Sequence, residues 1–286
     1  MSRTLGIDGA AWVALAVVLC VGAVVVTAIS AEDGTALSTA PLATALDWQP
    51  ALGLREPWRL WTCAWVHWSA AHLLVNAVGA IVVAFVGWRA RLPAAAALAW
   101  FIAWPLTQGA MAALGSERVA AAMPHYGGLS GVLHAGVVVL GLSLAWPLTR
   151  ARPHPAAAAP RADTGFVATR ASAIEPSRIT EGPWAMTEMG TATALPASTL
   201  DQPPPVVPIE RPLRERWIGV AIVVGTLVKV VFEAPWDLAP RPSAGLGMSV
   251  APVAHACGVL AGVVAWAVVR AGVARGRAGV ARGRAG

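Results

Sequence analysis

The chain has 286 residues, of which 57% are hydrophobic and only 13% charged, and its formal net charge is +6. Together with a mean hydropathy of +0.62, this composition excludes an ordinary soluble domain and indicates a protein that crosses a membrane several times. The positive charge does not indicate a nucleic-acid partner, because the basic residues lie in predicted loops and in the C-terminal tail, where the positive-inside rule places them.

Motifs for cofactors are missing from the sequence. The three cysteines, Cys20, Cys63 and Cys257, are far apart and form no CxxC pair, so they indicate neither a metal site nor a disulfide framework. No nucleotide or redox motif is present either. We therefore expect a protein that works without a metal or a cofactor.

Four membrane helices are predicted in the first half. Residues 10–30 form a nearly uninterrupted apolar run, which is long enough to span the hydrocarbon. A cleaved signal peptide is the alternative, since residues 28–31 resemble a small-residue cleavage site, but the run exceeds the usual h-region of roughly 7–15 residues. A polar loop follows, in which the amphipathic residues 58–61 are expected at the membrane interface. Three more helices are predicted at 69–88, 93–114 and 130–148.

The second half begins with a change in composition. Residues 149–212 are rich in proline, alanine and threonine and have no apolar periodicity, which is typical of a disordered connector. Two further helices are predicted at 217–232 and 251–269, and the arginine-rich end is expected to be a solvated tail that can touch anionic lipid. The predicted fold is an all-α polytopic membrane protein with six transmembrane helices, divided into helices one to four (1–148), a cytoplasmic connector (149–212), helices five and six (213–270) and a basic cytoplasmic tail (271–286).

The distribution of positive charge orients this bundle. With both termini in the cytoplasm, sixteen of the 21 lysine and arginine residues fall in inner segments and four in outer loops, while Lys229 lies within the fifth helix. This asymmetry predicts that both termini are cytoplasmic. The second, fourth and sixth helices then run from the outside to the inside.

A serine flanked by glycines stands where the fourth predicted helix begins. The stretch from Gly127 to His134 reads GGLSGVLH, with the serine at Ser130. Glycines let a backbone turn sharply and approach a ligand closely. A helix start also offers free N–H groups and the positive end of a dipole to a developing oxyanion. The alternative is that the small residues only let two membrane helices pack closely.

Three other polar side chains are predicted at the depth of Ser130. His72 and Asn76 are four residues apart and share one face of the second helix, and His255 lies about one turn into the sixth. Polar residues inside a membrane are costly, so they usually face the bundle interior or a water-filled cavity. A serine and a histidine brought together there suffice for nucleophilic catalysis.

The pair Gly258 and Gly262 forms a GxxxG beside His255. Such a pair lets the sixth helix press against a neighbour. We expect this close approach to bring the imidazole of His255 to the hydroxyl of Ser130.

Taken together, these motifs resemble the signature of the rhomboid intramembrane serine proteases. The resemblance covers about residues 50–148 and 217–269 and rests on Trp58-Arg59, His67-x4-His72-x3-Asn76, Gly128-Leu129-Ser130-Gly131 and His255-x2-Gly258-x3-Gly262. It implies a six-helix rhomboid bundle in which the fifth helix is a lateral gate. It also implies that Ser130 is the nucleophile and His255 the general base, with an oxyanion hole formed by His72, Asn76 and the Ser130 N–H.

The segment GLSGVLH resembles the rhombosortase branch in particular, whose members are proposed to process bacterial proteins that bear a C-terminal Gly-Gly-type sorting helix. This resemblance implies a bacterial inner membrane protein with its site near the periplasmic face, with transmembrane proteins and membrane lipid as partners. His134 departs from the tyrosine that many bacterial rhomboids carry one turn after the serine, so an imidazole is expected to stack on His255. The connector is a second departure, since the compact family core lacks it.

Lys229 and Glu233 are four residues apart and share one face of the fifth helix. In the predicted orientation both lie near the outer surface. They are either an ion pair at the membrane interface or a possible gate that faces the groove through which substrate enters.

Three alternative functions stay open. A general rhomboid protease for single-pass proteins would use the same residues on another substrate. An inactive rhomboid-like binding protein would typically lack Ser130 or His255, and both are present. A transporter would usually show internal repeats or paired broken helices, and the sequence has neither.

Overall fold

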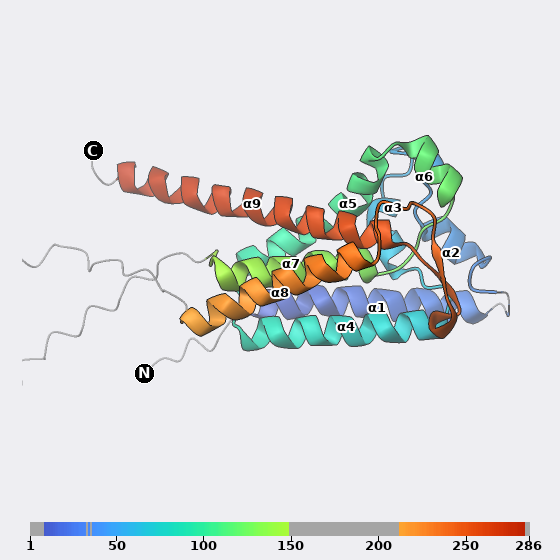
Figure 1. Cartoon of the computed structure of the whole chain (residues 1–286), viewed down its shortest axis with the longest axis horizontal. Helices are drawn as coiled ribbons and strands as arrows, with labels where there is room; N and C mark the ends of the chain where they lie inside the picture. Colours follow the sequence, from blue (N-terminus) through green and yellow to red (C-terminus); the bar gives the residue numbers. More distant parts are fainter. Residues whose placement is uncertain (1–8, 33, 35, 149–211, 284–286) are drawn as a thin grey trace, which may run out of the picture. The chain divides into compact units, whose positions relative to one another are not determined.

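A computed structural model describes residues 9–32, 34, 36–148 and 212–283, which all belong to one compact unit. The predicted connector, apart from Pro212, and the last three residues of the basic tail lie outside the described residues. The described part is predominantly helical (Figure 1).

Six long helices of the described part lie alongside one another (Figure 1). They are α1 (Ala10–Glu32), α4 (Ala70–Arg89), α5 (Ala94–Ala113), α7 (Ser130–Ala145), α8 (Leu213–Phe232) and α9 (Pro252–Gly283). Their bounds lie within a few residues of the predicted helices, with the exception of the end of α9. Apolar periodicity and the proline and glycine positions therefore locate these elements well.

The predicted end of the sixth helix near residue 269 is wrong. The helix α9 continues to Gly283, so residues 271–283 of the predicted tail are helical. This segment contains four alanines, four glycines, three arginines and two valines, and no proline. Alanine and arginine continue a helix readily, and the glycines between them weaken the helix without stopping it.

Three helices of the described part are long and apolar enough to cross a membrane by length and composition. They are α1, α4 and residues Pro252–Gly276 of α9. The helix α7 is apolar but has only 16 residues. The helix α8 carries charged residues in its first turn and Lys229 in its last. The chain therefore has the character of a membrane protein.

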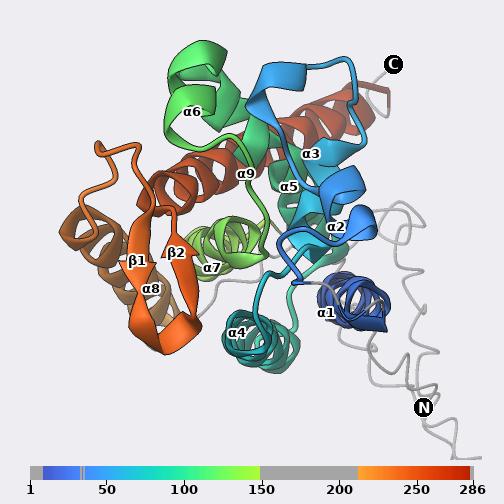
Figure 2. The same ribbon diagram turned by 90° about the vertical axis from the view of Figure 1, so that its right-hand side faces the viewer.

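Short elements gather at one end of the long helices (Figure 1). These are α2 (Pro41–Leu46), η1 (Pro50–Leu52), α3 (Arg59–Thr62), η2 (Cys63–Trp65), α6 (Ser116–Ala122), η4 (Ala244–Leu246) and an antiparallel hairpin of β1 (Arg241–Ser243) and β2 (Met248–Val250). The helices α4, α7 and α9 all start at this end (Figures 1 and 2). Side chains on their first turns are therefore brought to one level.

The helix α7 is the centre of the bundle. Viewed from the end that carries the short elements, it is surrounded by α4, α5, α8 and α9 (Figure 2). Thirteen of its 16 residues are buried, which explains why its sequence is apolar all round. Trp100 of α5 donates a hydrogen bond from its indole to the carbonyl oxygen of Val132 (2.8 Å) and so ties the neighbouring helix to it.

Candidate active site

A tightly constrained loop presents Ser130 as the first residue of α7. Gly128 has a φ of +129°, and a Cβ there would lie 2.6 Å from Cε1 of His72, so both its backbone and its surroundings require glycine. The Gly128 N–H donates to the carbonyl oxygen of Cys63 (2.9 Å). Tyr126, two residues before Gly128, exchanges backbone hydrogen bonds of 2.8 and 2.9 Å with Trp48. The nucleophile candidate therefore sits on a loop that is held at several points.

The backbones of α7 and α9 are in direct contact next to Ser130. A Cβ on Gly258 would lie only 2.0 Å from the carbonyl oxygen of Gly131, and one on Gly262 would lie 2.7 Å from that of Ala135. This packing brings Nε2 of His255 to 3.1 Å from Oγ of Ser130, although the two residues are 125 positions apart. His255 is only 5% exposed, so its hydrogen bonds are made inside the bundle.

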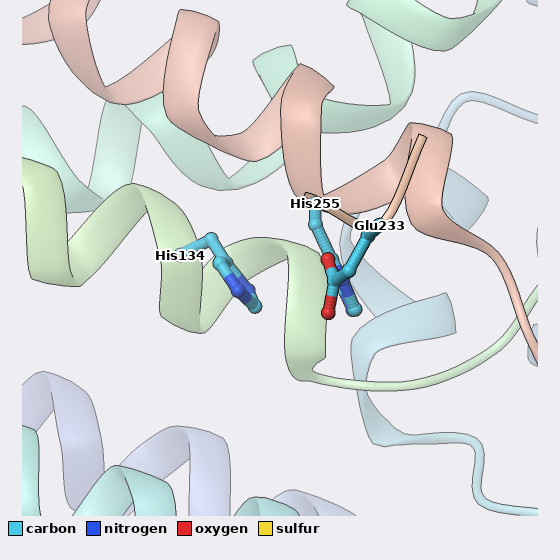
Figure 3. Close-up of side chains that lie close together, drawn as sticks. All are labelled: His134, Glu233 and His255. Atoms are coloured by element: carbon cyan, nitrogen blue, oxygen red, sulfur yellow. The ribbon is translucent and has the colours of Figure 1, made fainter. Parts of the chain in front are cut away.

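The other side of the His255 ring is also occupied. Its Nδ1 lies 2.7 Å from Oε2 of Glu233, and its face is stacked on the ring of His134 at 4.2 Å between centroids and 18° between planes. Figure 3 shows the Glu233 carboxylate beside the His255 ring, with His134 reaching toward them from α7. The sequence predicts Glu233 as a partner of Lys229 in an ion pair or a possible gate, and it does not predict the contact of Glu233 with His255. Its depth on the fifth helix is the one signal that could have suggested the contact with His255.

Lys229 links the second carboxylate oxygen of Glu233 to the ring of His134. Its Nζ donates to Oε1 of Glu233 (2.5 Å) and contacts Nε2 of His134 (3.0 Å). The Nδ1 of His134 lies 2.7 Å from the carbonyl oxygen of Ser130. These contacts fit one tautomer of His134, in which Nδ1–H donates to the carbonyl and Nε2 accepts from the ammonium.

Two side chains of α4 face the same site. The helix is capped by Ser69, whose hydroxyl accepts from the backbone N–H of His72 (3.1 Å), as is common at helix starts. The His72 ring is buried, and its Nδ1 has no hydrogen-bond partner among the described residues. Asn76 is 4% exposed, and its Nδ2 donates to Nε2 of His67 (3.0 Å).

His67 positions Asn76 from the loop that precedes α4. Its Nδ1 lies 3.2 Å from the carbonyl oxygen of Trp65. Burial lowers the pKa of His67 to about 4, because a charged ring is disfavoured away from water. The ring therefore stays neutral near pH 7, with Nδ1–H donating and Nε2 accepting.

Two cavities meet at Ser130 and His72. The larger one measures about 560 Å³ and lies between α4, α7 and α8, where it has an aliphatic wall formed by Val75, Val82, Val83, Leu133 and Val137. Its polar end contains Ser130, His255, Lys229 and Glu233. The smaller one measures about 260 Å³ and lies beside the β1–β2 hairpin, where Trp68, Tyr126 and Met248 contribute to its wall.

A buried ionic network holds the loop in front of Ser130. Arg59 donates through Nη1 to the backbone oxygen (2.7 Å) and Oδ1 (3.0 Å) of Asp47, and Oδ2 of Asp47 lies 2.6 Å from Nδ1 of His125. Arg59 is 7% and Asp47 1% exposed. Within the stretch 58–61, which is expected at the membrane interface, Trp58 is exposed, whereas Arg59 points inward because buried acceptors pair with its guanidinium.

The cluster of His134, Glu233 and His255 has donor atoms within 4.8 Å of one another, a spacing that suits a metal ion. Lys229, however, already contacts both Glu233 and His134, and an ammonium offers only donors. Nε2 of His255 faces Ser130. The side chains thus satisfy one another, which suits proton transfer better than metal binding.

Comparisons with known proteins found no match. No family model, curated protein or solved structure matches the chain. Function is therefore inferred from the geometry and chemistry of the site.

Proposed function

We propose that the protein is an intramembrane serine endopeptidase of the rhomboid type. The observation that carries the proposal is the 3.1 Å contact between Oγ of Ser130 and Nε2 of His255 at the polar end of an apolar cavity. Nucleophile and base lie within hydrogen-bond reach, as covalent catalysis by serine requires. The resemblance of the sequence motifs to rhomboids points to the same reaction.

In the proposed reaction, Oγ of Ser130 attacks the carbonyl carbon of the scissile peptide bond and loses its proton to Nε2 of His255. The oxyanion receives hydrogen bonds from His72, Asn76 and the N–H of Ser130 at the start of α7. As the C–N bond breaks, His255 returns the proton to the leaving amine. A water molecule, activated by the same histidine, then hydrolyses the acyl-enzyme.

The proposed topology has six membrane-spanning helices, α1, α4, α5, α7, α8 and α9, with both termini in the cytoplasm. The supporting observation is the excess of arginine in the segments assigned to that side. The first turns of α4, α7 and α9 then lie toward the periplasm of a bacterial inner membrane. The shorter helix α7 fits this topology because it is shielded by its neighbours.

The substrate is proposed to be a transmembrane protein whose membrane segment approaches along the larger cavity. The aliphatic wall of this cavity fits an apolar helix, and its polar end presents Ser130 to the backbone. A peptide bond in a helix is shielded by its own hydrogen bonds, so a Gly-Gly-type segment, which unwinds easily, suits the site. The fit of a Gly-Gly-type segment favours a rhombosortase-like protease over a general rhomboid protease.

Covalent labelling tests the proposed function. A fluorophosphonate probe should modify the detergent-solubilised wild type on a single serine, which peptide mass spectrometry should identify as Ser130. The variants Ser130→Ala and His255→Ala should lose labelling while they keep the wild-type melting temperature. Ser143→Ala, on the same helix but away from the site, should label normally. Equal labelling of Ser130→Ala and wild type would contradict the protease hypothesis and would favour an inactive rhomboid-like binding protein.

A further inference from the structure

The acidic group beside His255 comes from the end of a different helix. Glu233 directly follows α8 as its C-cap residue, and the next residue, Ala234, has a φ of +52°. A left-handed residue at this position turns the chain away from the helix. The carboxylate stays next to α9, where Oε2 lies 2.7 Å from Nδ1 of His255.

We propose that Glu233 is a positioning residue that completes a Ser130–His255–Glu233 triad. This inference rests on the proposed protease function and extends it, because that function requires only the serine and the histidine. The arrangement follows one line of contacts: Oγ of Ser130 to Nε2 of His255 at 3.1 Å, and Nδ1 of His255 to Oε2 of Glu233 at 2.7 Å.

Glu233 selects the tautomer of the base. A carboxylate accepts hydrogen bonds and does not donate them, so Nδ1 of His255 must carry its proton. The lone pair is then on Nε2, which faces the hydroxyl of Ser130. When the serine proton moves to Nε2, the resulting imidazolium lies against a negative charge. Glu233 stays ionised throughout and transfers no proton.

Lys229 and His134 keep Glu233 in this place. The ammonium of Lys229 holds the second carboxylate oxygen and is itself held by His134, which is anchored on the backbone of Ser130. The contacts form a closed circuit that joins α7, α8 and α9. An ion pair at a membrane interface would satisfy Lys229 and Glu233 alone, whereas here the free oxygen of Glu233 is directed at the nitrogen that sets the tautomer.

The groups that face His255 can be named from each packed element. They are Ser130 and His134 on α7, Lys229 and Glu233 at the end of α8, and His72 on α4. Glu233 is the acidic group in contact with His255 among the described residues. Its replacement therefore removes the negative charge that stabilises the imidazolium.

The variant Glu233→Gln keeps the shape of the side chain and removes its charge. In soluble serine proteases, the corresponding acid-to-amide change lowers kcat on the order of 10⁴-fold, because it favours the wrong histidine tautomer. We expect the rate of Ser130 labelling by a fluorophosphonate to fall by at least about 10²-fold. The acidic limb of its pH–rate profile should move to lower pH, since the imidazolium loses a neighbouring negative charge. Glu233→Asp, which keeps the negative charge, should label faster than Glu233→Gln and should have the acidic limb at the same pH as wild type.

Asp237→Asn is the matched control, because Asp237 pairs with Arg241 on the same loop at 3.5 Å and does not contact the site. It should leave the rate and the profile unchanged. A Glu233→Gln protein that labels within about threefold of wild type, with an unchanged limb, would overturn the triad while leaving Ser130 as the nucleophile. Failure of wild type itself to label on Ser130 would instead overturn the proposed function, so the two failures are distinguishable.

A second measurement determines the tautomer of His255 in the wild-type protein itself. In wild-type protein with ¹⁵N-labelled histidine, the NMR signals of His255, assigned by their loss in His255→Ala, should show the proton on Nδ1 at neutral pH. A proton on Nε2 instead would contradict the role of Glu233.

Discussion

The close contact between α7 and α9 at Gly258 allows the effect of a Gly258→Ala substitution to be predicted from distances. A Cβ added at Gly258 would stand 2.0 Å from the carbonyl oxygen of Gly131, whereas ordinary van der Waals contact begins at 3.4 Å. The obstacle is backbone, which cannot swing aside, so the helices must separate locally by about 1.4 Å, the difference between these two distances. His255 lies less than one turn from Gly258, so its Nε2 moves away from Ser130 by a similar distance.

This displacement breaks the contact between Ser130 and His255. Added to the present 3.1 Å, a shift of that size takes the pair well beyond hydrogen-bond range. A misplacement of about 1 Å can cost on the order of 10² in rate, and overpacking of a close contact costs about 1–3 kcal/mol of stability. We therefore expect Gly258→Ala to slow fluorophosphonate labelling of Ser130 by about 10²-fold and to lower the melting temperature in detergent.

Gly225→Ala provides the control for Gly258→Ala. Gly225 lies within α8, and an added Cβ there meets nothing within 4 Å, so this variant should label and melt like wild type or slightly better, since alanine favours a helix. Gly262→Ala, whose Cβ would meet the carbonyl oxygen of Ala135 at 2.7 Å, should have an intermediate effect on the rate. A Gly258→Ala protein with wild-type rate and stability would show that the approach of the two backbones does not position His255.

Three further predictions concern the surroundings of the site. Arg59→Ala leaves the buried carboxylate of Asp47 without its guanidinium partner and should lower the free energy of unfolding by about 3–5 kcal/mol. Arg55→Ala, at an exposed position, should change this free energy little. Equal effects of the two variants in chemical denaturation would contradict the buried network. Asn76→Ala should reduce the rate of cleavage by on the order of 10²–10³ with a small change in melting temperature, and unfolding instead would mean that Asn76 only joins structural elements. Because the pKa of His67 is about 4 in the folded protein against 6.5 for the free side chain, the unfolded chain binds the proton first, so stability should fall by on the order of 3 kcal/mol as the pH drops from about 6.5 to 4. His67→Gln should flatten that part of the stability curve, and an identical slope in both proteins would exclude His67 as its source.

The positions of the long helices and of the polar residues on them follow from the sequence. Apolar runs bounded by proline and glycine place five of the six helices within a few residues. The motif around Ser130 and the pair Gly258 and Gly262 point to contact between their two helices, because small residues permit close approach whatever the surroundings.

The details that join different helices do not follow from the sequence. The contact between Glu233 and His255 depends on the left-handed turn at Ala234 and on how α8 packs against α7, and the spacing of 22 residues contains no sign of it. Likewise, the hydrogen bond between His67 and Asn76 depends on the path of the loop before α4. The sequence pattern does not show the full extent of α9, because hydropathy indicates where a helix can enter a membrane and carries little information on where the helix stops.

Cleavage inside a bilayer tests the central claim most directly. The wild-type protein and its Ser130→Ala variant are each reconstituted into liposomes with a synthetic single-pass peptide that carries a Gly-Gly pair before its apolar segment, and the products are identified by mass spectrometry. We predict that wild type cuts the peptide at or next to the Gly-Gly pair and that Ser130→Ala leaves it intact. An intact peptide with both proteins, or equal cleavage by both, would contradict the assignment of Ser130 as the nucleophile of an intramembrane protease.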